Sequence, residues 1–117
     1  MRYLALSTFA VAAFAAGIPG AAAASRPALC TLIVDGKTYI NGRCDFEADA
    51  DGSFRIFGKR YFAYVDVEGD SAHATWNKDP KATHAHSDLG TFARKGACWE
   101  NARARICARD LRAGRGR

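Results

Sequence analysis

Short apolar runs rich in β-branched and aromatic residues alternate with turn-forming residues along most of this chain. The turn signals lie at Asp35-Gly36, Asp51-Gly52, Glu68-Gly69-Asp70, 77–80 and Lys95-Gly96. The runs between them have the length and composition of β-strands, and an Asp-Gly pair between two such runs is a strong hairpin signal. Strands are therefore predicted over residues 29–34, 37–40, 53–57, 60–67, 71–76, 91–94, 97–100 and 104–108.

This spacing of strands and turns predicts an all-β, mainly antiparallel fold: a small barrel or sandwich of about seven short strands. No window shows a convincing helical stripe. Residues 99–111 are rich in alanine and arginine, however, so a short C-terminal helix is the alternative to a last strand. The apolar positions expected to form the core are Leu32, Val34, Phe54, Ile56, Phe62, Tyr64, Trp76, Phe92 and Ile106.

Residues 1–24 have the order of features found in a secretory signal peptide. Arg2 gives a basic start, an almost wholly apolar stretch runs to Ile18, and small residues follow from Ala21 to Ser25. The apolar stretch is shorter than the ~20 residues of a bilayer-spanning helix, so no transmembrane segment is expected. We predict cleavage near Ala24, one domain over 25–109, a flexible basic tail over 110–117, and a location in the periplasm or outside the cell.

The cysteine pattern also fits an exported protein. An even number of cysteines in a short exported chain usually forms disulfides, and the spacings lack the close ligand pairs of structural zinc sites. Four cysteines allow three connectivities, of which we favour the two pairs that are local in sequence. The expected bridges are Cys30–Cys44 around the first hairpin and Cys98–Cys107 around the last.

Positive charge is concentrated at the C-terminal end of the chain. The formal net charge is +5, and from residue 94 onward eight basic residues face two acids, Glu100 and Asp110. This pattern suggests an anionic cell-envelope ligand, although an unspecific basic tail explains it as well. Nucleic acid is not an expected partner of an exported chain whose tail lacks aromatic stacking platforms. The candidate ligand-binding residues are Arg103, Arg105, Arg109 and Arg112.

A histidine cluster is the candidate metal site. If the segment around residues 82–88 is a strand, His84, His86 and Asp88 lie on one face, and His73 from the preceding strand is a further ligand. Imidazole and carboxylate groups suit zinc or copper. The alternative is that these histidines lie on a solvated loop.

Two other kinds of site are less well supported by the residues. The acidic run 47–54 resembles the start of a calcium loop, but Gly58 stands where the closing glutamate is expected, so a solvated turn is favoured. No Gly-x-Ser-x-Gly elbow or other complete catalytic motif occurs, and we do not expect an enzyme. The abundant aromatic residues from Tyr61 to Trp99 suit a binding face wherever they point outward, although filling of the core accounts for most of them. Alternation allows Tyr61 and some others to face outward while Phe62 and Tyr64 face the core.

The segments 89–92 (Leu-Gly-Thr-Phe), 96–101 (Gly-Ala-Cys-Trp-Glu-Asn) and Ile106-Cys107 resemble small exported bacterial proteins that have no assigned activity. In size, export and disulfide-braced β character the chain is similar to periplasmic lysozyme inhibitors, although it lacks their inhibitory loop motif. The expected function is thus a monomeric, non-enzymatic and inhibitor-like binding protein for a protein or cell-envelope component. The alternative is a periplasmic metal-binding protein that uses His84 and His86.

Overall fold

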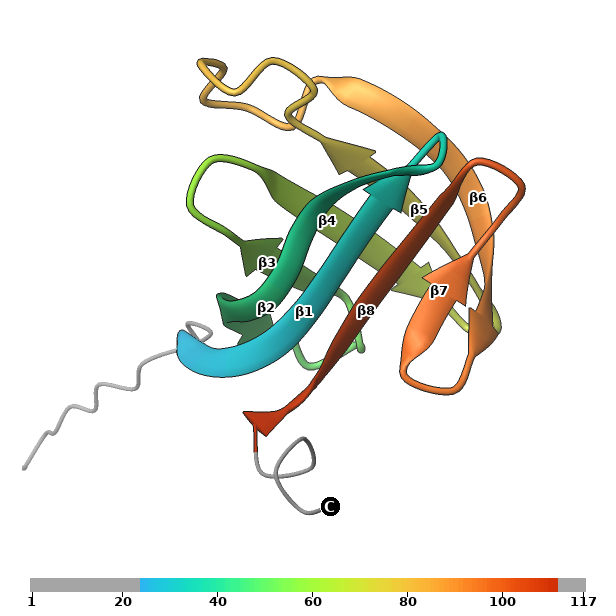
Figure 1. Ribbon diagram of the computed structural model, residues 1–117. Coiled ribbons are helices and arrows are strands. Elements are labelled where there is room, and N and C mark those ends of the chain that lie inside the picture. The colour runs from blue at the N-terminus through green and yellow to red at the C-terminus, as the bar shows by residue number, and fades with distance from the viewer. Residues whose placement is uncertain (1–23, 112–117) are drawn as a thin grey trace, which may run out of the picture.

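The computed structural model describes residues 24–111, which form eight β-strands and no helical element (Figure 1). Residues 1–23 of the predicted signal peptide (residues 1–24) lie outside the described part, and so do residues 112–117 of the predicted tail, with Arg112. The strands are β1 (Arg26–Val34), β2 (Lys37–Ala48), β3 (Phe54–Phe57), β4 (Phe62–Glu68), β5 (Ser71–Trp76), β6 (Ser87–Lys95), β7 (Cys98–Glu100) and β8 (Ala104–Asp110).

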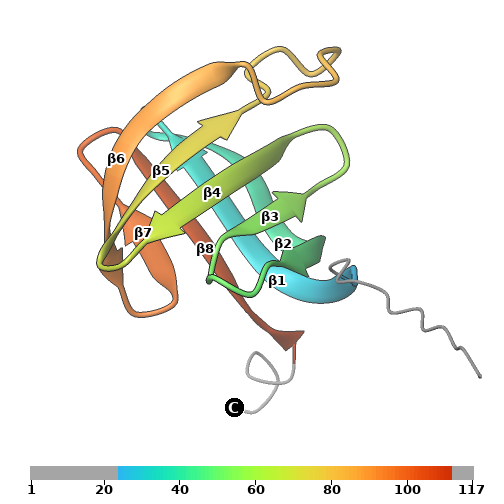
Figure 2. The same cartoon turned by 180° about the vertical axis from the view of Figure 1, so that it is seen from behind.

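Each strand pairs antiparallel with the next, and β8 returns to pair with β1, which closes the sheet into a barrel (Figure 2). The predicted all-β class and the barrel are confirmed, with eight strands in place of about seven. The alternative C-terminal helix is wrong, because its segment forms β7 and β8. Along β8, Ala104 and Ile106 are buried while Arg105 is exposed, which is the period of a strand.

The first hairpin turns as its Asp-Gly pair predicts. Asp35 and Gly36 have φ values of 51° and 81°. Two successive positive φ values are those of a type I′ turn, whose twist matches that of the flanking strands. The turn places Val34 directly opposite Lys37 and so sets the start of the β1–β2 register.

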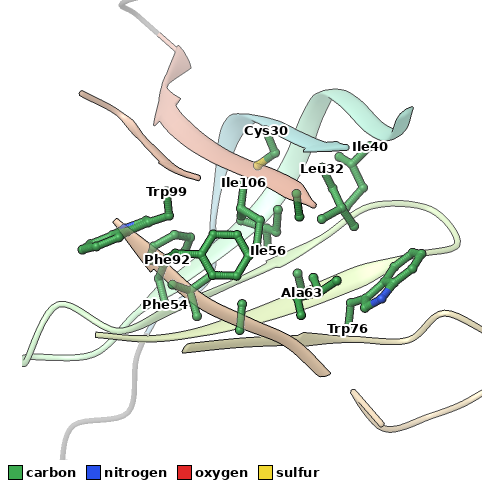
Figure 3. Close-up of a cluster of buried hydrophobic side chains, with 14 of the residues drawn as sticks. Cys30, Leu32, Ile40, Phe54, Ile56, Ala63, Trp76, Phe92, Trp99 and Ile106 are labelled. Carbon is green, nitrogen blue, oxygen red and sulfur yellow. The ribbon is translucent and has the colours of Figure 1, made fainter. Parts of the chain in front are cut away.

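The core fills the inside of the barrel with side chains from all eight strands (Figure 3). All the predicted core residues are buried except Phe62 and Tyr64, for which the prediction is wrong. Their neighbours Ala63 and Val65 point inward instead, both with 0% exposure. Ala63 lies opposite Trp76 in the β4–β5 register, so its small side chain leaves room for the indole ring. Because side chains alternate along a strand, this choice turns both aromatic residues outward.

Strand β2 is longer than predicted and changes its neighbours along its length. It pairs with β1 from Lys37 to Phe46, but its pairing with β3 begins only at Asp45. Between these regions Gly42 has a φ of 132°, a conformation that glycine adopts readily and other residues rarely. Strand β2 is curved along its length (Figure 1), and only its second half pairs with β3.

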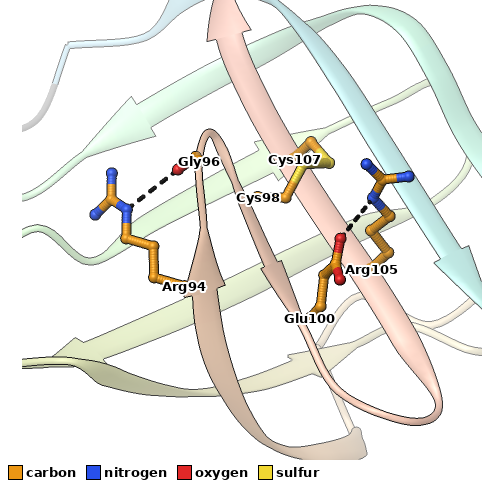
Figure 4. The surroundings of a disulfide bond; sticks show 6 residues. All are labelled: Arg94, Gly96, Cys98, Glu100, Arg105 and Cys107. Atoms are coloured by element: carbon orange, nitrogen blue, oxygen red, sulfur yellow. Dashed lines mark hydrogen bonds and ion pairs between the residues drawn. A yellow bond between two sulfur atoms is a disulfide. The ribbon is translucent and has the colours of Figure 1, made fainter.

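Both predicted disulfides are present. Cys30–Cys44 joins β1 to β2 with a Cα–Cα distance of 5.9 Å, and Cys30 belongs to the core cluster. Cys98 and Cys107 lie directly opposite each other on β7 and β8, beside the Glu100–Arg105 ion pair (Figure 4). Disulfides persist in oxidising compartments, so the folded protein belongs outside the cytoplasm. No helix within residues 24–111 is long and apolar enough to cross a membrane.

Candidate functional site

Three aromatic rings form a cluster on the outside of the barrel wall. Phe57 on β3 and Phe62 and Tyr64 on β4 are each partly exposed. The ring centroid of Phe57 lies 5.7 Å from that of Phe62 and 6.3 Å from that of Tyr64. The centroids of Phe62 and Tyr64 are 5.8 Å apart. We call these three residues the outer aromatic cluster. The three rings contact one another, and none of them belongs to the core cluster.

Strand register brings the cluster together, and an arginine holds one side of it. Phe57 lies opposite Phe62, and Arg55 lies opposite Tyr64. The Arg55 guanidinium donates to Glu47 Oε1 and, through two nitrogens, to both oxygens of Asp49, each at 3.1 Å. The hydrogen bond from Arg55 lowers the pKa of the Asp49 carboxyl below its ordinary value of 3.8. This network ties the end of β2 to β3 beside the cluster.

A buried asparagine holds the other side. Asn77 is fully buried, its Oδ1 accepts a hydrogen bond from the Phe62 backbone N–H at 2.7 Å, and its Nδ2 donates to the Arg60 carbonyl at 3.0 Å. Phe62 pairs with Phe57 of β3 on one side. On the β5 side the strand register begins only at Ala63, and there Phe62 bonds to Asn77 through both the asparagine side chain and its backbone N–H. The sequence pattern predicts only a turn at residue 77, because an asparagine before a Lys-Asp-Pro segment has the composition of a loop.

A second group of rings lies at the end of the barrel where β2 separates from β3. Tyr39 packs edge-on against Trp76, with a centroid distance of 4.6 Å, and against Tyr61, with a distance of 4.9 Å. The Lys37 ammonium lies 5.5 Å from the Tyr39 ring centroid. These side chains cover the barrel interior at a point where no backbone pairing does so.

Between the two groups of rings lies a groove of about 600 Å³. It follows β2 on one side and the end of β3 with the following loop on the other. Its lining residues are Tyr39, Ile40, Asn41, Arg43, Cys44, Asp45, Phe57, Gly58 and Lys59. Phe57 belongs both to this groove and to the outer aromatic cluster, so the two form one continuous surface. The groove was not predicted from the sequence, because it depends on the point at which β2 and β3 separate.

The predicted arginine site is not a set of free cations. Arg103 contacts both oxygens of Asp35 at 3.2 Å, and Arg105 pairs with Glu100 at 3.0 Å. Hydrogen bonding to Arg103 lowers the pKa of Asp35, and the same bond raises the pKa of Arg103. Arg109 is exposed on β8, while Arg112 lies outside the described residues. Two of the four predicted residues therefore already have anionic partners within the protein.

The predicted metal ligands are only partly brought together. His73 on β5 contacts the Asp88 carboxylate on β6, with Nε2 2.5 Å from Oδ1. His84 and His86 lie in the loop between β5 and β6, and not on a strand. There His84 Nδ1 contacts the Thr83 hydroxyl and His86 Nδ1 contacts the His84 carbonyl. Within residues 24–111, no three His, Cys, Asp or Glu side chains are grouped closely enough to hold a metal ion.

The acidic run after β2 forms a turn, as favoured from the missing closing ligand. Asp49 is paired with Arg55, and Asp51 accepts a hydrogen bond from the Ser53 backbone N–H at 2.9 Å. The buried Ser53 in turn accepts, at its hydroxyl, a hydrogen bond from the Val67 N–H at 2.8 Å. These bonds explain the acidic and hydroxyl residues of this segment by its local structure.

The surface with the clearest recognition chemistry is thus the outer aromatic cluster with its adjoining groove. It offers apolar rings, the cations Arg43 and Lys59, and the edge of a strand. Comparison of the chain with protein-family models, with curated proteins and with solved structures finds no match. The geometry of the described residues is therefore the basis on which a function is inferred.

Proposed function

We propose that this is an exported, non-enzymatic binding protein of the periplasm or extracellular space, and that its ligand is a protein. The observation that carries the proposal is the outer aromatic cluster. Phe57, Phe62 and Tyr64 lie outside a barrel whose interior is already filled by other side chains. Aromatic rings are among the residues that contribute most to protein–protein binding, because they bury a large area at a low cost in side-chain entropy.

The surroundings of the cluster fit a protein-binding surface. Binding sites of this kind combine an apolar centre with a polar rim. Arg55, Glu47 and Asp49 supply such a rim on one side, and their mutual hydrogen bonds hold it in one arrangement. The cluster lies on β3 and β4, which pair with each other, and β3 also pairs with β2. A partner would therefore meet a preformed surface.

An anionic envelope polymer is the competing ligand, and the ion pairs weaken the case for it. Electrostatic binding to a polymer needs cations that are free to meet it. Arg103 and Arg105 would first have to leave Asp35 and Glu100. Salt dependence separates the two ligands, because ionic binding weakens steeply with salt while binding through buried rings does not.

The proposal is tested with the oxidised protein, immobilised and exposed to the envelope and culture fractions of its source. The variant replaces Phe62 and Tyr64 by serine. The matched control replaces Leu29 and Ile33, which are partly exposed on the outer face of β1, by serine as well. We expect the wild type and the control to retain the same protein, and the aromatic variant to lose at least about tenfold in affinity for it.

Circular dichroism and retention of both disulfides show whether each variant is folded. Equal retention by the aromatic variant and the wild type contradicts a role for the cluster. Retention of envelope polymer alone, abolished by salt, contradicts the protein ligand and favours the arginines. The mass of the exported chain, measured on the same preparation, tests the predicted cleavage near Ala24.

A further inference from the structure

The two halves of β2 differ in whether the edge that faces away from β1 is paired with another strand. Residues 45–48 pair with β3, whereas residues 39–44 have a strand neighbour, β1, on one side only. Gly42, with its φ of 132°, lies within the half that does not pair with β3. We call residues 39–44 the open edge of β2. Unpaired strand edges present backbone donors and acceptors to any extended chain that approaches them.

The open edge keeps its backbone groups free of the neighbouring loop. In the β1–β2 register Pro27, which has no N–H, lies opposite Asp45. Asn41 and Arg43 have the same phase as Asp45, so their N–H and C=O groups point away from β1. The loop facing them bonds to itself, because the Gly58 N–H donates to the Tyr61 carbonyl at 2.8 Å. Outside the β1 ladder, no backbone hydrogen bond of residues 39–44 to another described residue is found.

The groove beside this edge has the features of a strand-binding channel. Ile40 lies at its floor, close enough to Gly58 that a Cβ there would meet the Ile40 side chain at 3.0 Å. Phe57, which lies opposite Asp45 and belongs to the outer aromatic cluster, lines the groove, and so does Tyr39 at the start of the open edge. In strand addition, the backbone of the bound segment pairs with the edge while alternate side chains enter such apolar sites.

The charges around the groove indicate which charge a bound segment should carry. Arg43 extends from the open edge and Lys59 from the facing loop, and both are exposed. Neither forms an ion pair with an acid among residues 24–111. Asp45 is the one acid of the lining. An extended segment with acidic side chains is the occupant that complements this balance.

We propose that the open edge of β2 binds an extended acidic segment of a partner protein, which adds to the sheet as a strand along Asn41–Arg43. This inference rests on the proposed function and names the form that the ligand takes: a strand in the groove, continued by contacts to Phe57 and its cluster. A second copy of this chain is a different occupant, which the tests below distinguish.

Amide hydrogen exchange of the free protein is the first test. The amides of Asn41 and Arg43 should exchange rapidly, whereas those of Gly42 and Cys44, which point toward β1, should be protected. Slow exchange at both Asn41 and Arg43 in the free protein overturns the proposal, because the edge is then already covered.

Binding is tested with short synthetic peptides in which valine alternates with glutamate, and with matched peptides that carry lysine instead. We expect the acidic peptides to bind, to slow the exchange of the Asn41 and Arg43 amides, and to exceed the basic peptides in affinity by at least about tenfold. Methylation of alternate peptide nitrogens keeps every side chain but removes the strand hydrogen bonds, and should weaken binding by about tenfold. Absence of binding at millimolar peptide, or binding unaffected by methylation, overturns the proposal.

Two variants locate the site on the protein. Asn41→Pro removes one outward N–H, at a position where an edge strand tolerates proline, and should abolish peptide binding. Arg43→Glu should weaken acidic-peptide binding about tenfold, whereas its control Lys95→Glu, at an exposed position of β6 away from the groove, should leave it within about twofold. Should Asn41→Pro fail to fold, Arg43→Glu and the methylated peptides still decide the question. Equal effects of Arg43→Glu and Lys95→Glu overturn the proposed site.

The outcome for the natural partner is separable from that of the proposed function. A partner lost by the Phe62 and Tyr64 variant but kept by Asn41→Pro supports the binding function and overturns strand addition. A concentration-dependent dimer that is abolished by Asn41→Pro overturns the proposed partner, because the edge then binds a second copy.

Discussion

Asp35 serves two structural roles at one position. Its positive φ forms half of the first hairpin turn, and its carboxylate accepts two hydrogen bonds from Arg103, 68 residues away. Its backbone N–H also donates to the Arg103 carbonyl at 2.8 Å. An Asp-Gly pair indicates the turn from sequence alone, but nothing local to it indicates that the same residue fastens β8.

Gly36→Ala tests the turn at the residue scale. The φ of 81° is strained for any residue with a Cβ, although no atom lies within 4 Å of the position where a Cβ would be. We therefore expect a loss of about 1 kcal/mol in the free energy of unfolding, from backbone conformation alone. Urea denaturation measures it, with the exposed Thr38→Ala of the same hairpin as the control. A variant as stable as the control contradicts this account.

Residue-level prediction failed where two faces of a strand were both apolar. Strand β4 carries Phe62 and Tyr64 on one face and Ala63 and Val65 on the other, and hydrophobicity alone favours the larger pair as core. The deciding fact is the indole of Trp76 opposite Ala63, which no local pattern reveals. The outer aromatic cluster, the main candidate site, was missed for this reason.

At the scale of elements, the hairpin turns were predictable and the course of β2 was not. The Asp-Gly and Glu-Gly-Asp signals give the turns because they require particular φ values. The Asn41-Gly42-Arg43 segment has the composition of a turn, yet it continues β2 around a bend. Pairing with β1 on one side and the Cys30–Cys44 bridge hold it extended. The open edge thus follows from long-range contacts.

The junction of β2 and β3 gives a prediction about pH. Arg55 lowers the pKa of Asp49 below 3.8, so their interaction stabilises the folded state above that pH and is lost as the pH falls toward the lowered value. Arg55→Gln should therefore be less stable than the wild type at neutral pH, with a difference that shrinks below about pH 4. Urea denaturation at several pH values measures this, with Lys81→Gln as control. A difference independent of pH assigns the effect to packing of the Arg55 side chain.

For the whole molecule, the two disulfides should contribute unequally to the free energy of unfolding. Cys30–Cys44 closes a separation of 14 residues inside the core, whereas Cys98–Cys107 closes 9 residues and lies outside the core cluster. Replacing either pair by alanine should cost about 2–4 kcal/mol, with the larger loss for Cys30–Cys44 because a longer loop and core packing are both lost. Guanidinium denaturation of the two double variants measures the order. A larger loss for Cys98–Cys107 contradicts it.

The closure of the ring by β1 and β8 has a consequence for how the chain folds. Every other strand pair joins neighbours in sequence, so hairpins can form independently, whereas the β1–β8 pair must bring together the two ends of the described domain. Such a non-local step carries the largest loop-closure entropy and forms late. Until it forms, the sheet has two bare edges that pair as readily with another molecule as with each other. The Asp35–Arg103 contact spans this seam, so weakening it should favour exchange of β8 between molecules during refolding at high protein concentration.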